Sequence, residues 1–373
     1  MALQTETLNI KYSAINPGSA ETKITFIPGS PDLISLYNPG SDEKRRRCFV
    51  TDATVATLPI MRSFISLFED GLCGKDILVI LGSGEPYKTM DSVLEIVSNA
   101  IDAGFSRKDL FVGIGGGVIC DMTGFAASMF KRGIACQFVP TTLLSMVDAA
   151  IGGKTGADFK NYKNMIGAFW PAEEIHIFPE FVKYLPKNQY RSGLGEAIKT
   201  GLLFDKELFD IFKNEAQKLL DADKETIFSV IKKCASDKAK IVEQDLTEQN
   251  VRMYLNLGHT FGHALETITG LGTVAHGDAV AWGIGRAVSL CAKLEYCRES
   301  FKDEVLSVLE KFGWSTKPIP DFVTGGGFSE RLLNAMKKDK KNTSAKIRCT
   351  LLKGLCEPFT EEIEDSKIIS VLK

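Results

Sequence analysis

The stretch LFVGIGGGVICDMTGF, residues 110–125, decides the fold class of this chain. Its first five residues are apolar or small and predict a buried strand, and Gly115-Gly116-Gly117 then lead into an apolar helical pattern. A strand that enters a helix through bare glycine backbone is typical of an anion-binding turn, because backbone N–H groups and the helix dipole both favour phosphate. The spacing is not GxGxxG, so a tight turn without a ligand is the alternative.

Further short apolar segments read as strands, and several are separated by helical patterns such as residues 91–103 and 118–130. Strands that are apolar almost throughout and alternate with helices predict a mainly parallel sheet covered on both faces. The predicted strands are residues 24–28, 48–52, 77–81, 110–114, 136–140 and 174–178.

The character of the sequence changes after Leu185-Pro186. Residues 206–220 and 225–242 place their apolar side chains on one helical stripe, and helical patterns continue through residue 312. A chain of 373 residues also exceeds the usual size of a single core. We therefore expect an α/β nucleotide-binding domain over residues 1–186 and an all-α domain over residues 187–373.

The composition excludes several classes of protein. A net charge of −2, from 45 basic and 47 acidic residues, gives no indication of a nucleic-acid or membrane surface, and the run at 44–47 is interpreted as a solvated turn. Nine cysteines without a CxxC pattern favour reduced thiols. No signal-peptide pattern opens the sequence, and no apolar run approaches the roughly 20 residues of a membrane span. A cytoplasmic location is expected.

Three of only four histidines lie close together in the sequence: His259, His263 and His276. Residues four apart on a helix point the same way, and two imidazoles with one carboxylate form the pattern of a catalytic zinc-type centre. His259 and His263 therefore suggest a pair of metal ligands. The alternative is a set of satisfied core histidines, because HxxxH is common.

Two other strand ends and one loop carry polar groups that suit a phosphorylated ligand. Asp52 ends one predicted strand and Glu85 follows another, where a carboxylate can hold ribose hydroxyls, although singly each would more often be a cap or a turn residue. Lys154, Lys163 and Asn164 lie among glycines in a segment expected to be loop. The sequence GGKTG there fails the P-loop spacing, which excludes that class of nucleotide triphosphatase.

From these residues outward, the chain resembles the 3-dehydroquinate synthases, a family of the sugar phosphate cyclases. The resemblance rests on colinear motifs over residues 110–290: GGGVICDMTGF, KRG, VPTTLLSMVDAAIGGKTG, KNMIGAF, SGLGEAIKTGL, RMYLNLGHTFGHALE and HGDAVAWG. It implies an N-terminal nucleotide-binding α/β domain and a C-terminal helical domain, with the active site in the cleft between them. It also implies a homodimer.

The resemblance implies a metal held by Glu196, His259 and His276, for which zinc and cobalt are both suitable. His263 would then face the substrate, which revises the interpretation from the HxxxH spacing. The residues implied to contact NAD are Asp52, Glu85, Lys88, Gly115, Gly116, Gly117, Val118, Asp121, Thr141, Thr142, Leu144, Asp148, Lys154 and Lys163.

The substrate contacts are implied by the same motifs. Lys238 and Arg252 would receive a carboxylate, with Glu248 supporting Arg252. Lys199 would lie near the metal, and Asp148 would bind a ring hydroxyl. The residues implied to contact the phosphate and the ring are Lys154, Asn164, Asn256, His263, a lysine at 340 or 341 (Lys340 is taken), and Arg132 from a neighbouring subunit.

The implied reaction is cyclisation of 3-deoxy-D-arabino-heptulosonate 7-phosphate to 3-dehydroquinate with release of phosphate, a lyase step of the shikimate pathway to aromatic amino acids. NAD would be regenerated in each turnover. Three alternatives remain: a cyclase for a neutral sugar phosphate, of inosose or valiolone type; a metal- and NAD-dependent polyol dehydrogenase; and a binding protein of the same fold. Cys120 and Asp278 depart from the family pattern, which has glycine and glutamate there, and Asp278 is expected beside the ligands.

Overall fold

The computed structural model describes residues 3–12, 19–40, 45–160, 162–270, 272–338 and 346–373. The chain divides into two compact units, the first comprising Met1–Pro186 with Lys238–Thr247 and the second Lys187–Asp237 with Glu248–Lys373. Helix α9 (Lys224–Gln244) therefore contributes residues to both. The expected domains, residues 1–186 and 187–373, remain predictions, and the units differ from them in the placement of residues 238–247.

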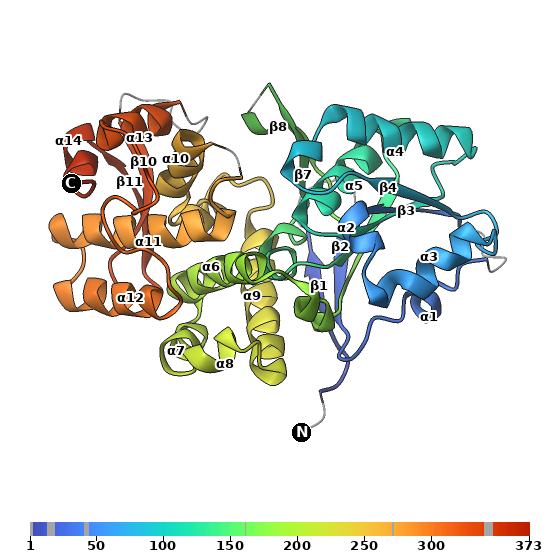
Figure 1. Cartoon of the computed structure of the whole chain (residues 1–373), viewed down its shortest axis with the longest axis horizontal. Helices are drawn as coiled ribbons and strands as arrows, with labels where there is room; N and C mark the ends of the chain where they lie inside the picture. The colour runs from blue at the N-terminus through green and yellow to red at the C-terminus, as the bar shows by residue number, and fades with distance from the viewer. Residues whose placement is uncertain (1–2, 13–18, 41–44, 161, 271, 339–345) are drawn as a thin grey trace. The chain divides into compact units, whose positions relative to one another are not determined.

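The first unit is built on a seven-stranded sheet with the strand order β1-β2-β9-β6-β5-β3-β4 (Figure 1). Only the pair β1–β2 is antiparallel, so the predicted mainly parallel sheet is confirmed. All six predicted strands are present, and β1 adds an edge that the sequence analysis did not predict. The strands are β1 (Glu6–Lys11), β2 (Glu21–Phe26), β3 (Arg47–Asp52), β4 (Ile77–Leu81), β5 (Leu110–Gly115), β6 (Ala135–Pro140) and β9 (Glu174–Ile177).

Helices cover both faces of this sheet, as the apolar strands require. Phe49 of β3 packs edge-on against Phe64 of α3 on one face. Phe111 of β5 is aligned with Cys48, the neighbour of Phe49, so it points to the other face, where it contacts Phe130 just after α5. Figure 1 shows α1 and α3 on one side of the strands and α4 and α5 on the other. The helices of this unit are α1 (Leu33–Tyr37), α2 (Ala53–Ala56), α3 (Arg62–Glu69), α4 (Met90–Asp102) and α5 (Gly117–Met129).

The glycine-rich segment expected to be loop is instead an antiparallel hairpin of β7 (Lys154–Phe159) and β8 (Tyr162–Phe169). Gly156 and Gly167 are paired across it, and a Cβ on Gly156 would lie 2.6 Å from the carbonyl oxygen of Ile166. The strands come this close because they lack side chains there. The same glycines and lysines removed the alternating apolar pattern by which a strand is predicted.

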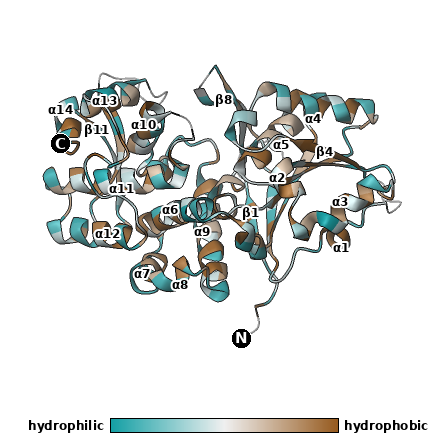
Figure 2. Cartoon of the chain, viewed as in Figure 1, coloured by the Kyte–Doolittle hydropathy of each residue, from teal (hydrophilic) through white to brown (hydrophobic). Residues whose placement is uncertain are grey.

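The second unit is mainly helical, as predicted. Its central helix, α11, contacts α6, α10 and α12, and it buries Trp282 against Phe261 and Phe328. Figure 2 colours the helices of this unit in both teal and brown, as expected for amphipathic helices. The helices are α6 (Lys187–Phe204), α7 (Lys206–Asn214), α8 (Ala216–Leu220), α9 (Lys224–Gln244), α10 (His259–Thr269), α11 (His276–Lys293), α12 (Glu299–Lys311), α13 (Phe328–Lys337) and α14 (Asp365–Ile369).

The expectation of an all-α second domain is wrong for the C-terminal part. Strands β10 (Ile347–Leu352) and β11 (Pro358–Ile363) form an antiparallel hairpin in this unit. The run IRCTLL is short and only partly apolar, and periodicity alone cannot assign so few residues to a strand or a helix. None of the described helices combines the length and the apolar character that crossing a membrane needs.

The arginine run at 45–47, interpreted from the sequence as a solvated turn, is tied into the sheet. Arg47, the first residue of β3, is buried and forms an ion pair with Asp76, which precedes β4, at 2.7 Å. Arg46 pairs with Asp109, which precedes β5, at 2.9 Å. Arg45 reaches the Glu173 carboxylate, before β9, with two nitrogens at 2.8 and 3.1 Å. The three arginines therefore join the amino ends of four strands.

Replacing Arg47 with Met should destabilise the first unit by about 3–5 kcal/mol, because the buried Asp76 carboxylate would lose its partner. Arg45→Met is the matched control, since its pair with Glu173 is about one-third exposed and should contribute about 0–1 kcal/mol. Urea unfolding of the two variants measures the difference. Equal losses would contradict the role assigned to Arg47.

Candidate active site

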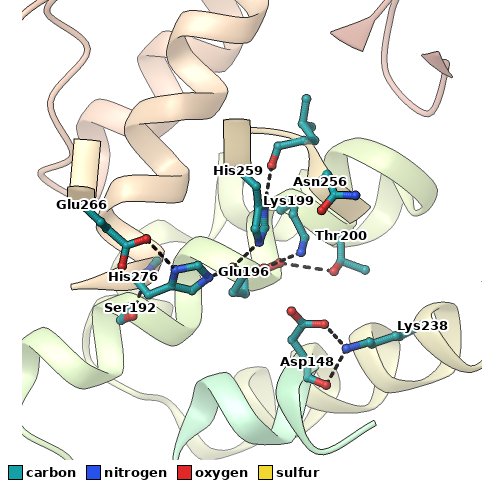
Figure 3. A network of polar contacts seen from close by, with 12 residues as sticks. Asp148, Ser192, Glu196, Lys199, Thr200, Lys238, Asn256, His259, Glu266 and His276 are labelled. Carbon is teal, nitrogen blue, oxygen red and sulfur yellow. Dashed lines mark hydrogen bonds and ion pairs between the residues drawn. The ribbon is translucent and has the colours of Figure 1, made fainter. Parts of the chain in front are cut away.

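Glu196, His259 and His276 converge from three different helices of the second unit (Figure 3). Glu196 lies on α6, His259 begins α10 and His276 begins α11. The carboxylate oxygen Oε1 of Glu196 is 3.2 Å from Nε2 of His276 and 3.5 Å from Nε2 of His259. The structure thus brings together the three side chains that the motif resemblance implies as metal ligands.

The helices approach closely enough for this contact because glycines lie where they cross. A Cβ on Gly277 of α11 would be 1.8 Å from the carbonyl oxygen of Ser192 on α6. A Cβ on Gly195 would be 2.2 Å from the carbonyl oxygen of Gly277. On α10, a Cβ on Gly262 would be 2.9 Å from the carbonyl oxygen of Ala279. No side chain larger than hydrogen fits at the α6–α11 crossing, so these glycines set the spacing of the site.

The two histidines of this cluster are oriented through their other ring nitrogen. Nδ1 of His259 is 3.2 Å from the carbonyl oxygen of Leu257, which can only accept a hydrogen bond, so Nδ1 carries the proton. Nδ1 of His276 is 3.3 Å from the Glu266 carboxylate. Both Nε2 atoms are thereby directed at Glu196. A ring held by a carbonyl or a carboxylate behind it is the usual setting of a metal-binding histidine.

The charges of the cluster compensate one another. Glu196 is buried, which by itself raises the pKa of its carboxyl, but Lys199 at 2.5 Å and His276 hold that pKa well below its usual range. Burial lowers the pKa of His276, but its contacts with Glu196 and Glu266 outweigh this and raise the pKa to about 10. Glu196 is therefore an ionised buried acid, as a metal ligand must be.

His263 belongs to the same cluster. Ring nitrogens of His259, His263 and His276 all lie within 4.8 Å of one another, so these histidines together could also hold a metal ion. The ring of His263 stacks on that of His276 with centroids 5.6 Å apart. Both the interpretation from the HxxxH spacing and the motif resemblance therefore point to one cluster, and which side chains bind the metal stays a prediction.

The predicted substrate contacts of this unit lie on and beside one short 3₁₀ helix, Val251–Asn256. Arg252 is buried, and Asn256 donates to the Glu248 carboxylate at 2.7 Å. The support of Arg252 by Glu248 stays a prediction, and the hydrogen bond to Asn256 places the Glu248 carboxylate beside the same 3₁₀ helix. Glu248 also has a left-handed backbone, with φ of 59°. Lys340, and Lys341 beside it, lie outside the described residues.

The glycine turn of the first unit is as bare as the sequence predicted. Strand β5 ends at Gly115 and α5 begins at Gly117, with no side chain capping the first turn of this helix. A Cβ on Gly116 would lie 3.0 Å from the Thr142 side chain. Thr141 donates its backbone N–H to the Gly115 carbonyl at 2.9 Å. The turn therefore exposes backbone N–H groups at the carboxyl end of the sheet, next to the predicted contacts Val118 and Leu144.

A second polar group of this unit surrounds Lys88. Its buried ammonium donates to Asp121 at 2.6 Å and to the side-chain oxygen of Asn164 at 2.5 Å. Burial lowers the pKa of Lys88, but the Asp121 carboxylate outweighs this and raises it. Lys163 pairs with Glu85 at 3.6 Å. Four predicted NAD contacts and one predicted phosphate contact are thus brought together.

Asp52 is a helix-capping residue, which was the alternative to a ribose contact at this strand end. It caps α2, accepting from the backbone of Thr54 and Val55 and from the Ser83 hydroxyl at 2.9–3.0 Å. All three bonds go to Oδ1. The second carboxylate oxygen, Oδ2, is not used by these donors, so capping does not preclude a ribose contact.

Asp148 and Lys238 form an ion pair within the first unit (Figure 3). Lys238 also donates to the backbone oxygen of Asp148 at 2.6 Å, and Asp148 lies in a π-helical turn, Ser145–Ala149. Arg132 and Asn164 have left-handed backbones, with φ of 67° and 51°. Lys154 begins β7.

The residues that hold the metal-binding candidates in place were not predicted from the sequence. Glu266 follows His259 by seven residues on α10, two helical turns on the same face, so its spacing could have indicated it. Arg191 and Trp314 both bind the Asp278 carboxylate, at 2.6–2.9 Å. No spacing rule connects these two to Asp278, because they lie far apart in the sequence.

Comparison with known proteins identifies the family. Residues 78–192 match the 3-dehydroquinate synthase N-terminal family, and residues 193–342 match the 3-dehydroquinate synthase C-terminal family. The chain belongs to the 3-dehydroquinate synthase family. A 3-dehydroquinate synthase of Acidithiobacillus ferrooxidans is 37% identical over 329 residues, 87% of each chain. The chloroplastic 3-dehydroquinate synthase of Solanum lycopersicum is 38% identical over 87% of this chain and 71% of its own length.

Solved structures show the same fold in related cyclases. The 2-epi-5-epi-valiolone synthase ValA of Streptomyces hygroscopicus, with NAD+ and Zn2+ bound, has a TM-score of 0.83 at 25% identity and covers 97% of this chain and 98% of its own. A 2-deoxy-scyllo-inosose synthase complexed with carbaglucose-6-phosphate, NAD+ and Co2+ has a TM-score of 0.81 at 23% identity, covering 98% and 99%. The predicted fold class is confirmed, apart from the β10–β11 hairpin.

Replacing Gly277 with Ala should disrupt the candidate site, because a methyl group would overlap the carbonyl oxygen of Ser192. Overpacking of this kind costs about 1–3 kcal/mol or more. Gly285→Ala is the matched control on the same helix, since its Cβ would have no neighbour closer than 3.4 Å. The midpoint temperature of thermal unfolding and the zinc content should both fall for Gly277→Ala, and both should stay unchanged for Gly285→Ala. Similar behaviour of both variants would show that the close crossing does not set the site.

Proposed function

We propose that this member of the 3-dehydroquinate synthase family converts 3-deoxy-D-arabino-heptulosonate 7-phosphate to 3-dehydroquinate and phosphate, using NAD and a divalent metal ion. The observation that carries the proposal is the convergence of Glu196, His259 and His276, with both Nε2 atoms directed at the buried carboxylate. The wider metal- and NAD-dependent fold includes enzymes of other reactions. The sequence relatives at 36–38% identity favour the synthase among them.

The donor set fits a zinc or cobalt ion. One carboxylate and two imidazoles leave coordination positions open, which suits a catalytic rather than a structural ion. When bound, such an ion would favour ionisation of a coordinated substrate hydroxyl. The protein's contribution is to aim both Nε2 atoms at Glu196, through Leu257 and Glu266 behind the rings, and a bound metal ion would replace the proton on Nε2 of His276. ValA and the inosose synthase carry Zn2+ and Co2+, respectively, on the same fold.

The glycine turn fits the pyrophosphate of NAD, because no side chain caps the first turn of α5 and its backbone N–H groups can face a phosphate. When bound, NAD would accept a hydride and return it within one turnover, so the reaction involves no net oxidation. Asp52 and Glu85 would hold ribose hydroxyls at the adjoining strand ends, and the buried Lys88 would place positive charge near the cofactor. NAD+ is bound in both cyclase structures.

The predicted substrate contacts include cationic side chains that would suit a substrate with both a carboxylate and a phosphate. Arg252 is buried on the 3₁₀ helix beside the histidine cluster, and its planar fork suits a carboxylate. Lys154, Asn164 and Arg132 are assigned to the phosphate end. We assign the substrate carboxylate to Arg252 and to Lys238, which also pairs with Asp148. The shared active site of the two units and the homodimer stay predictions of the sequence.

Two alternatives make different products. A cyclase for a neutral sugar phosphate would have no substrate carboxylate for Arg252 to bind. A polyol dehydrogenase would accumulate NADH and release no phosphate. The first alternative is favoured only by the fold likeness to ValA and the inosose synthase.

The central test is phosphate release from the heptulosonate phosphate, with NADH followed in the same sample by absorbance. Phosphate should appear with no accumulation of NADH, and a chelator or His259→Ala should abolish it, because both remove the metal. Net NADH formation would favour a dehydrogenase. Full activity of His259→Ala with full zinc content would overturn the ligand assignment.

Arg252→Ala should raise KM for the heptulosonate phosphate by roughly ten- to 150-fold, as expected for the loss of a charged hydrogen-bonded pair worth about 1.5–3 kcal/mol. Arg252→Lys should recover only part of this, since an ammonium cannot bind a carboxylate in a bidentate manner. Steady-state kinetics measures the effect. Unchanged KM in both variants would favour a neutral sugar phosphate as substrate.

A further inference from the structure

We propose that Arg191, Ser192, Asp278 and Trp314, here called the α6–α11 clasp, position His276 against Glu196 and thereby set the affinity of the site for its metal. None of the four is a candidate ligand. The proposal rests on the metal site of the proposed function for its consequence, but the contacts of the clasp are observed independently of it.

The clasp consists of four hydrogen bonds. Arg191 donates from Nε to Asp278 Oδ1 at 2.9 Å and from Nη2 to Oδ2 at 2.6 Å, a bidentate ion pair. Trp314, just beyond α12, donates from Nε1 to Asp278 Oδ1 at 2.8 Å. The backbone N–H of Gly277 donates to the Ser192 hydroxyl at 2.9 Å. Three side chains from two other segments therefore hold two consecutive residues of α11.

The position of these bonds is what links them to the site. His276 is the first residue of α11, and Gly277 and Asp278 follow it immediately. On α6, Ser192 lies four residues before Glu196, which is one helical turn along the same face. The clasp thus fixes the first turn of α11 to the turn of α6 that precedes Glu196. Any slip of one helix along the other would change the 3.2 Å separation of Glu196 and His276.

The crossing glycines alone do not determine this register. Small residues at Gly195 and Gly277 allow the two backbones to approach, but they have no directional group to prevent sliding. The bidentate pair supplies that direction, because both carboxylate oxygens and two guanidinium nitrogens must stay aligned. Asp278 also lies in the first turn of α11, where a carboxylate is favoured by the helix dipole.

The test is the zinc affinity of the full-length chain, measured by competition with a chromophoric chelator. Arg191→Met removes the bidentate pair from a partly exposed side chain. Lys213→Met is the matched control, since it removes another inter-helix ion pair of this unit, with Glu304, away from the ligand helices. Loss of an orienting contact outside the metal ligands typically weakens metal binding 10–100-fold. We expect that loss for Arg191→Met and an unchanged affinity for Lys213→Met.

Asp278→Asn provides a second variant, because an amide oxygen can still accept from Trp314 while the ion pair is lost. It should resemble Arg191→Met, and the double variant should be no weaker than either, since all remove one interaction. Zinc affinity of Arg191→Met and Asp278→Asn within twofold of the wild type would overturn the proposal. Equal losses in Arg191→Met and Lys213→Met would also overturn it, because they would indicate general destabilisation.

A second measurement separates this proposal from the proposed function. The four histidines should be distinguishable by their imidazole nitrogen signals in NMR spectra of the metal-free protein. Arg191→Met should shift the signals of His276 and leave those of His176, in the first unit, unchanged. If the wild-type chain binds no zinc, the proposed metal site fails while this measurement still decides the clasp. Unshifted His276 signals would overturn the clasp.

Discussion

The burial of one ionised carboxylate, that of Glu196, constrains the second unit more than any other interaction. An unpaired charge in such a position would be strongly destabilising, so cations and hydrogen-bond donors must surround it. Lys199 comes from the same helix, and His259 and His276 come from the starts of two others. Because helix starts are where a chain changes direction, this demand also fixes how α6, α10 and α11 meet. Glycine at the crossings is the steric condition under which that meeting is allowed.

The fold was predictable to the extent that its elements have a periodic or near-continuous apolar pattern. The six strands found from the sequence are mostly buried, although β2 and β4 include exposed residues, and the segment 225–242 corresponds to α9. The hairpin β7–β8 was missed because its glycines and lysines serve close backbone approach and polar contacts, which erase alternation. The hairpin β10–β11 was missed because the six residues IRCTLL are too few to distinguish a strand from a helix by their periodicity. The predicted single helix over residues 206–220 is divided into α7 and α8.

The candidate site was predictable for a different reason. Scarcity and spacing identified His259, His263 and His276, whereas Glu196 came only from the resemblance of SGLGEAIKTGL to a known family. Sequence patterns could not identify Arg191 or Trp314, since their partner Asp278 is 87 and 36 residues away, respectively. Nor could they show that Lys238 pairs with Asp148. Long-range polar contacts depend on the folded backbone, and local rules contain no information about them.

The amino and carboxyl ends of the parallel strands carry different polar groups. At the amino ends, Arg45, Arg46 and Arg47 tie neighbouring strands to one another through carboxylates. At the carboxyl ends lie Asp52 and the bare turn after Gly115. The ion pairs that join the strands therefore lie at the edge of the sheet where no ligand is expected. Evolution can therefore vary the recognition loops at one rim to suit a new substrate, while the opposite rim preserves foldability.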